Sequence, residues 1–255
     1  METSQGRAPV TIWGIHPVME FLKTCPDAVR EICVLPSFGN RPWQRKLLTL
    51  ALECGIKPIG VRDFNKQTIA PGAVHQGVTA RVMPIWPIDL AELPRHVGDH
   101  TPLLVACDQI TDPQNLGAII RSCVAFGAQA VIVPSRSCPE INGVVIKASS
   151  GAVAHIRVCE VSNLARALAA LKGMGLWVVG LSPEAETVVW DVDLSGPICL
   201  VVGAEGEGIR WLIKKTCDIT ASIPQHPGIG SLNAASAASV FLYEVTRQRR
   251  GPTKS

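Results

Sequence analysis

Four short runs of consecutive apolar residues place the strongest constraint on how this chain folds. They cover residues 103–107, 130–133, 176–181 and 198–202, and each is bounded by glycine, proline or charged residues. A strand that is apolar on both faces is buried on both faces, which is typical of a parallel sheet covered by helices. The second half of the chain is therefore predicted to be a layered α/β domain.

Helical patterns fall between these runs, at residues 113–126, 142–149, 163–174, 209–216 and 231–247. Earlier in the chain, helices are predicted at 16–24 and 42–54 and strands at 31–35, 57–61 and 77–82, which together indicate a smaller α/β domain. Pro84, Pro87 and Pro94 mark a connecting segment. We expect an N-terminal domain over residues 1–82, a linker over 83–100 and a second domain over 101–255.

Composition and charge argue against a metal site held by cysteines and against a membrane-spanning protein. The formal net charge of +3 permits an anionic partner but does not demand one, so an RNA site would have to be local. The nine cysteines form no CxxC pair, which predicts reduced, buried thiols and gives no support for a metal site. The first ten residues are polar and no segment is long and apolar enough to span a membrane, so a cytoplasmic protein is expected.

The first segment that carries chemistry follows the strand at 103–107. Asp112 is placed as the N-cap of a helix and Pro113 at its first position. The helical wheel puts Asn115, Gly117 and Arg121 on the arc opposite the large apolar residues. An arginine flanked by small residues is open to close approach by a ligand, although a solvated helix face is an equally good interpretation of this segment alone.

The second segment runs from the strand at 198–202 into Gly203-Ala204-Glu205-Gly206-Glu207-Gly208. Glycines directly after a strand let the backbone approach a ligand. The spacing is neither that of a dinucleotide fingerprint nor that of a phosphate loop, and two carboxylates suit a neutral or cationic ligand better than a phosphate. A tight turn with two exposed glutamates is the competing interpretation.

The third segment is a loop rich in proline and glycine, residues 223–230, that enters a helix with Ser231 as its cap. The helix residues 234–239 are all alanine or serine, which allows a neighbour to pack close to the backbone. Asn233 lies in the first turn, where side-chain amides usually bond a specific partner.

In this order, the three segments resemble the three motifs of the SpoU family in the SPOUT superfamily, RNA 2′-O-ribose methyltransferases. The resemblance covers residues 101–249. The start of the chain, with Trp13-Gly14-Ile15-His16-Pro17, and the His75-Gln76-Gly77-Val78 segment resemble the substrate-binding domain of the RlmB/TrmH-like branch. The family usually has Met or a similar residue and one glycine where this chain has residues 225–230, so a reshaped loop is expected there.

The resemblance implies a SPOUT-type parallel sheet with a C-terminal trefoil knot, preceded by a small α/β domain similar to a ribosomal protein. It further implies RNA capture by the N-terminal domain and a homodimer formed by the catalytic domains. The substrate implied is structured RNA, most closely a guanosine of large-subunit 23S rRNA. A tRNA or a resistance-type rRNA methyltransferase would share the same motifs.

By the same resemblance, the methyl donor is S-adenosylmethionine. Its binding is assigned to backbone positions in three loops, namely Val179, Gly180, Leu181, Gly203, Ile223 and Leu232. Arg121 is implied as the central catalytic residue. Because the pKa of arginine lies above about 12, we expect Arg121 to stabilise the developing alkoxide more than to act as a free base.

Asn115, Glu205 and Asn233 are the candidate partners that hold the Arg121 guanidinium and the ribose, and Glu205 as the base is the competing assignment. Arg41, Arg45 and Lys46 are candidate RNA contacts, with a solvated helix end as the alternative. His16 and His226 are open between RNA contact and a structural role.

Two alternative functions belong to other classes of protein. A non-catalytic RNA-binding or ribosome-assembly protein of the same fold would not need Asn115, Arg121, Glu205 and Asn233 together. A nucleotide-dependent oxidoreductase would need a GxGxxG motif after its first strand, and this chain offers none.

Overall fold

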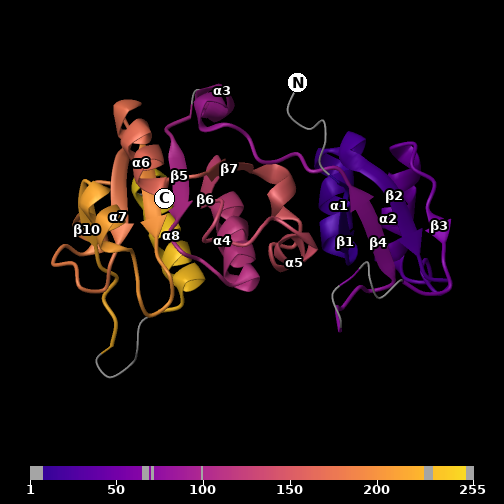
Figure 1. The fold of residues 1–255 in the computed structure, drawn as a ribbon. Helices are drawn as coiled ribbons and strands as arrows, with labels where there is room; N and C mark the ends of the chain where they lie inside the picture. The colour runs from indigo at the N-terminus through magenta and orange to yellow at the C-terminus, as the bar shows by residue number, and fades with distance from the viewer. Residues whose placement is uncertain (1–7, 65–68, 70–71, 99, 227–231, 251–255) are drawn as a thin grey trace. The chain divides into compact units, whose positions relative to one another are not determined.

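The computed structural model describes residues 8–64, 69, 72–98, 100–226 and 232–250. These residues form two compact units (Figure 1). The first unit comprises Met1–Trp86 together with Glu140–His155, and the second comprises Pro87–Pro139 and Ile156–Ser255. A segment from the middle of the chain therefore belongs to the N-terminal unit.

The first unit is built on a four-stranded mixed sheet with the order β1-β4-β2-β3. Strand β4 pairs antiparallel with both β1 and β2, whereas β3 lies parallel to β2. Its elements are β1 (Val10–Trp13), α1 (Ile15–Thr24), η1 (Pro26–Ala28), β2 (Val29–Val34), α2 (Pro42–Glu53), β3 (Ile59–Gly60), β4 (Val78–Val82), α5 (Gly143–Ala148) and η3 (Ala152–His155).

The segment 140–155 packs tightly against the N-terminal elements of this unit. A Cβ on Gly143 of α5 would collide with the backbone oxygen of Thr11 and the ring of Trp13. At the end of the segment, the His155 ring lies 2.8 Å from a carboxylate oxygen of Glu20 on α1. Close backbone packing and a polar contact together fix this segment on β1 and α1.

The second unit contains a six-stranded parallel sheet with the order β10-β8-β9-β5-β6-β7. The four predicted apolar runs form its strands β5, β6, β8 and β9. Its elements are η2 (Leu90–Glu92), α3 (Leu93–Val97), β5 (Leu103–Cys107), α4 (Pro113–Ala125), β6 (Ala130–Pro134), β7 (Arg157–Val161), α6 (Leu164–Gly173), β8 (Trp177–Leu181), η4 (Val189–Asp191), β9 (Ile198–Val202), α7 (Trp211–Thr216), β10 (Ile219–Ala221) and α8 (Ala234–Arg250).

Helices cover both faces of this sheet, as the apolar runs predicted. Alternate strand residues such as Leu104 and Ala106 pack against α3, α6 and α7 on one face. On the other face, α4 contacts β6 and α8 contacts β9, and these two helices pack against each other. The parallel α/β architecture predicted from the sequence is confirmed in this form.

Several details differ from the sequence-based expectations. Strands β1, β7 and β10 were not predicted, and β3 is only two residues long. The segment 83–100 contains α3, whose Leu93 and Val97 are buried in the core of the second unit. The nine cysteines are reduced thiols, but only four are buried and five are partly buried, whereas buried thiols were expected.

No helix among the described residues is long and apolar enough to cross a membrane. Within the same residues, no group of three His, Cys, Asp or Glu side chains is placed as a metal site would require.

Candidate functional site

The site lies where three loops at the carboxyl ends of parallel strands meet the start of α8. The β9 strand leads into the loop 203–208, which closes on itself: Ala204 N donates to Gly208 O at 3.1 Å, and Gly208 N donates to Ala204 O at 2.9 Å. Gly206 and Gly208 have φ angles of 79° and 68°, which favour glycine. Two backbone hydrogen bonds and two left-handed glycines thus fix the shape of this loop.

Gly203 has no room for a side chain. A Cβ there would collide with the backbone of Gly208 and Ile209. The residue is therefore glycine because two stretches of backbone touch at this point. This close approach holds the two ends of the loop together. The loop therefore presents backbone, in place of side chains, to the neighbouring pocket.

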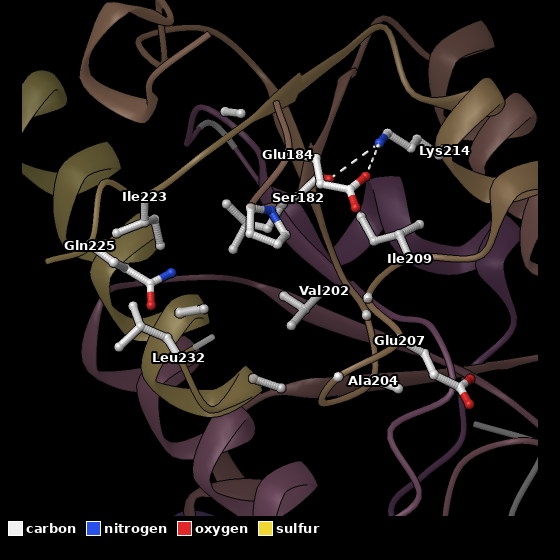
Figure 2. Close-up of a pocket in the computed structure, with 18 residues that line it drawn as sticks. Ser182, Glu184, Val202, Ala204, Glu207, Ile209, Lys214, Ile223, Gln225 and Leu232 are labelled. Atoms are coloured by element: carbon white, nitrogen blue, oxygen red, sulfur yellow. Dashed lines mark hydrogen bonds and ion pairs between the residues drawn. The ribbon is translucent and has the colours of Figure 1, made fainter. Parts of the chain in front are cut away.

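The pocket beside this loop is lined mainly by short or apolar residues (Figure 2). Ile223, Gln225 and Leu232 lie on one side of it, and Ser182, Glu184 and Lys214 lie on the other. The remaining lining residues are Leu181, Pro183, Val202, Gly203, Ala204, Gly206, Glu207, Gly208, Ile209, Ala221, Ala234 and Ala237.

Of the six positions assigned to the methyl donor from the sequence, Leu181, Gly203, Ile223 and Leu232 line this pocket. Val179 and Gly180 lie earlier in β8 and are buried, outside the set of described residues that line it. A Cβ on Gly180 would come within 2.9 Å of the Cys217 sulfur and 3.1 Å of a methyl carbon of Ile209. The role that the structure gives Gly180 is thus close packing beneath the pocket.

A polar group at the end of β8 was not singled out from the sequence. The Lys214 ammonium lies 3.3 Å from Ser182 Oγ and 3.7 Å from a Glu184 carboxylate oxygen. Ser182 directly follows a predicted strand, and the carboxyl end of a parallel strand is where ligands bind. That rule identifies Ser182, but the sequence has no signal that turns Lys214 toward it.

Three of the four predicted catalytic side chains are joined by hydrogen bonds. Asn233 Nδ2 donates to Asn115 Oδ1 at 2.9 Å and also to Glu205 Oε1. These residues come from α4, the loop after β9 and the residue before α8. Segments that are far apart in the sequence therefore meet in one polar cluster, which we call the Asn–Glu cluster.

The oxygen of the Asn233 side-chain amide fixes the start of α8. Its Oδ1 accepts hydrogen bonds from Ala235 N at 2.9 Å and Ser236 N at 3.2 Å. These are the bonds of a helix cap, which the sequence assigned to Ser231. Ser231 itself lies outside the described residues, and the same holds for residues 227–230 of the preceding loop.

Arg121, the fourth predicted residue, lies on α4 six residues after Asn115 and is exposed. Its helix face is not simply solvated. Ser122, on the same arc, shares a 2.7 Å hydrogen bond with Ser239 of α8, and α8 packs along this side of α4. The interpretation as a solvated helix face is therefore wrong for the part of the arc that α8 covers.

The start of α7 is held by a buried carboxylate. Asp108, at the end of β5, is completely buried and accepts from Arg210 N at 2.9 Å and from Arg210 Nε at 2.8 Å. Arg210 Nη2 lies 2.6 Å from the same carboxylate. Several charge-assisted bonds to one group give a rigid connection between β5 and α7.

Comparisons with known proteins agree with this architecture. The model of the SpoU rRNA methylase family matches residues 102–243, and the model for RNA 2′-O ribose methyltransferase substrate binding matches residues 11–85. The 23S rRNA (guanosine-2′-O-)-methyltransferase RlmB of Pseudomonas aeruginosa is 39% identical over 241 residues, covering 93% of this chain and 96% of the relative. The RlmB of Haemophilus influenzae is 38% identical and covers 94% of this chain and 98% of its own length.

Among solved structures, the SpoU methyltransferase AviRb from Streptomyces viridochromogenes, in complex with the cofactor AdoMet, is similar over 95% of this chain and 91% of its own. The TM-score is 0.77 and the sequences are 26% identical. The A. aeolicus TrmH/SpoU tRNA modifying enzyme has a TM-score of 0.55 at 27% identity and covers 63% of this chain. The matches to both family models and to full-length relatives show that the chain belongs to the SpoU rRNA methylase family.

Proposed function

We propose that this protein transfers a methyl group from S-adenosylmethionine to the ribose 2′-hydroxyl of a guanosine in 23S rRNA. The observation that carries this proposal is the Asn–Glu cluster, which joins all three family motifs beside a backbone-lined pocket. The RlmB relatives, which match this chain over nearly its whole length, support the guanosine of 23S rRNA as the target.

The pocket suits S-adenosylmethionine in shape and charge. Bound there, the donor supplies a methyl group activated by a positively charged sulfonium. The apolar walls formed by Val202, Ile223 and Leu232 suit the adenosine part, and the backbone exposed beside Gly203 allows close approach. Lys214 and Glu184 offer one charge of each sign to an amino acid's carboxylate and ammonium. We assign donor contacts to Leu181, Gly203, Ile223 and Leu232, with Val179 and Gly180 shaping the strand beneath.

For the reaction, we assign Arg121 to the attacking oxygen. The 2′-O–H bond breaks, a new bond forms between that oxygen and the methyl carbon, and the carbon–sulfur bond breaks with its electron pair on sulfur. A guanidinium stabilises the negative charge that develops on the oxygen and also binds the adjacent phosphate. The proton leaves to water as the methyl moves, since arginine stays protonated.

Asn115, Glu205 and Asn233 then act by position. Asn233 is fixed at the start of α8 through its Oδ1 and binds the other two through its Nδ2. The cluster thereby holds a carboxylate and an amide at set places for the ribose and for the Arg121 guanidinium. Glu205 as the proton acceptor is the competing assignment, and the two differ in their response to Glu205→Gln.

RNA capture is assigned to the N-terminal domain. Arg41 lies 5.7 Å from the ring centroid of Trp43 near the start of α2, and Arg45 and Lys46 follow on the same helix. Cations beside an exposed aromatic ring suit phosphates and an unpaired base. His16 and His226 remain candidates for RNA contact.

We also propose that the catalytic domain forms a homodimer and that the chain is threaded as a trefoil knot at the C-terminal end. Val240 and Tyr243 on α8 are 41% and 59% exposed, and an apolar helix face of this kind suits a second copy. The order β10-β8-β9, in which the last strand lies beside an earlier one, fits such threading. We propose a cytoplasmic location as well, which a 23S rRNA substrate supports.

The test is transfer of labelled methyl from S-adenosylmethionine to total RNA that lacks the modification, followed by mapping of alkali-resistant ribose positions. We expect one resistant guanosine in 23S rRNA. Label in tRNA would retain the reaction and replace the substrate, whereas measurable donor binding without transfer to any RNA would contradict the catalytic proposal. Sedimentation of the purified protein checks the dimer.

A further inference from the structure

The helix α7 has a cavity on each side. Lys214 lines the pocket beside the loop 203–208, which we call the donor pocket, whereas Leu212 and Ile213 line a separate groove. Arg210, which precedes α7, also lines this groove, and the other lining residues lie at the end of β6 or after β6 and β7, on the side of the sheet where its strands end. We call it the α7 groove. Its lining residues are Pro134, Arg136, Ser137, Ser162, Asn163, Leu164, Ala165, Arg210, Leu212 and Ile213.

The groove combines apolar lining with a cationic rim. Pro134, Leu164 and Ile213 are buried apolar residues, while the Leu212 side chain is 58% exposed. Arg136 is exposed, and none of the described residues that line the groove is an Asp or a Glu. A flat apolar ring with attached negative charge matches this combination.

Arg210 is fixed in place by a carboxylate that does not itself line the groove. Asp108 is completely buried and engages Arg210 through Nε and Nη2. A guanidinium has five N–H donors in a rigid fork, so these contacts orient the group and leave others to donate to a ligand. Little conformational entropy is then lost when an anion binds.

Polar groups of a second kind complete the rim. Asn163 caps the ten-residue helix α6 by accepting from Arg166 N at 3.0 Å, and Ser162 precedes it directly. The start of α6, with its positive end of the helix dipole, therefore lies at the groove beside the arginines. This arrangement favours a phosphate.

An exposed aromatic ring stands next to the groove. Trp211, which follows Arg210, is 68% exposed, and the Lys215 ammonium lies 4.0 Å from its ring centroid. Exposed aromatic rings flanked by cations are the means by which proteins bind unpaired nucleotides, since every base has a face that can stack. Leu212 adds apolar surface beside it.

We propose that the α7 groove binds an unpaired nucleotide of the RNA substrate, with its base against the apolar floor, the flanking phosphates on Arg136 and Arg210, and a neighbouring base on Trp211. This inference rests on the proposed function and deepens it, because it gives the catalytic domain an RNA contact separate from the donor pocket. Charge complementarity selects RNA over an apolar peptide as the occupant.

The test compares matched charge reversals in the full-length protein. Arg136→Glu changes the groove. Arg157→Glu makes the same change in an exposed arginine at the start of β7, at the amino ends of the parallel strands and away from the groove at their carboxyl ends. We expect Arg136→Glu to weaken binding of a 23S rRNA fragment on the order of tenfold and to lower the salt slope of binding by about 1. Arg157→Glu should leave both nearly unchanged.

A second pair tests the stacking contact. Trp211→Ala should weaken RNA binding by about 5- to 150-fold. Trp177→Ala removes a tryptophan that is 42% exposed at the start of β8, at the amino ends of the strands, and should have little effect on RNA binding. Calorimetric affinity for S-adenosylmethionine and the melting temperature should stay near wild type in all four variants.

Equal RNA affinities for Arg136→Glu and Arg157→Glu, with equal salt slopes, would overturn the groove assignment, as would a wild-type protein that binds no RNA. The groove and the proposed function fail separately. A wild type that binds RNA without methylating it contradicts the function, while the paired variants still decide the groove on the same RNA.

Discussion

The donor pocket and the Asn–Glu cluster share the loop 203–208, yet they are built from different parts of it. Gly203, Ala204 and Gly208 present mainly backbone to the pocket, whereas Glu205 extends its carboxylate to Asn233. One loop thus supports a recognition surface made of main chain and a reactive cluster made of side chains. Side-chain replacement should damage the cluster through lost chemistry and the pocket only where an added atom has no space.

The largest expected effect is that of Arg121→Ala. Losing the group assigned to the developing alkoxide should lower the rate of methyl transfer by about 10²- to 10³-fold. Affinity for S-adenosylmethionine, measured by calorimetry, should remain near wild type. Loss of donor binding instead would assign Arg121 to the pocket and break the division between the two regions. Arg95→Ala, at an exposed position of α3, serves as the control.

Gly203→Ala tests the close backbone contact that shapes the donor pocket. The added methyl collides with Gly208 and Ile209, so the loop must shift, at a cost of about 1–3 kcal/mol in the free energy of unfolding. Donor affinity should fall with it. The matched control is Gly173→Ala at the end of α6, where a Cβ meets nothing within 4 Å and should leave stability unchanged or raise it by up to about 1 kcal/mol.

Glu205→Gln separates a positioning role from that of a base. The amide keeps the size of the carboxylate but weakens the bond to Asn233, for which we expect about a tenfold loss of turnover. The pH dependence of the rate should keep its shape. A loss as large as that of Arg121→Ala, together with loss of the acidic limb of the profile, would identify Glu205 as the proton acceptor.

The smallest effect is expected for Ser239→Ala. It removes the 2.7 Å hydrogen bond to Ser122 between α8 and α4, which contributes about 1 kcal/mol. Thermal unfolding should shift slightly while turnover and donor affinity stay the same. A large loss of turnover would mean that the helix pair, and not the cluster alone, positions the reacting groups.

Much of the sheet was predictable from sequence because its central strands are apolar on both faces. Strand β7 (Arg157–Val161) was missed because it is an edge strand that carries Arg157 and Glu160, so its pattern lacks a continuous apolar run. β10 has only three residues, too few for any periodicity. The attachment of residues 140–155 to the first unit depends on tertiary contacts that leave no local signal.

The site was less accessible to local reasoning. Asn115, Glu205 and Asn233 lie on three separate segments, and only the ordered resemblance to a family suggested that they act together. Ser231 was predicted as the helix cap in place of Asn233 because both residue types cap helices well and the sequence does not define the first helical residue. Lys214 was missed because a single lysine on a short helix has no distinguishing pattern.

The position of α7 between two cavities has a thermodynamic consequence. Lys214 on this six-residue helix reaches the donor pocket, and Leu212 and Ile213 reach the groove, so a movement of α7 alters both. If the bound donor raises the affinity for RNA by some factor, bound RNA must raise the affinity for the donor by the same factor, because the binding steps form a closed thermodynamic cycle. The anchoring of Arg210 by Asp108 restrains the start of α7, and a restrained helix transmits less of any such mutual effect.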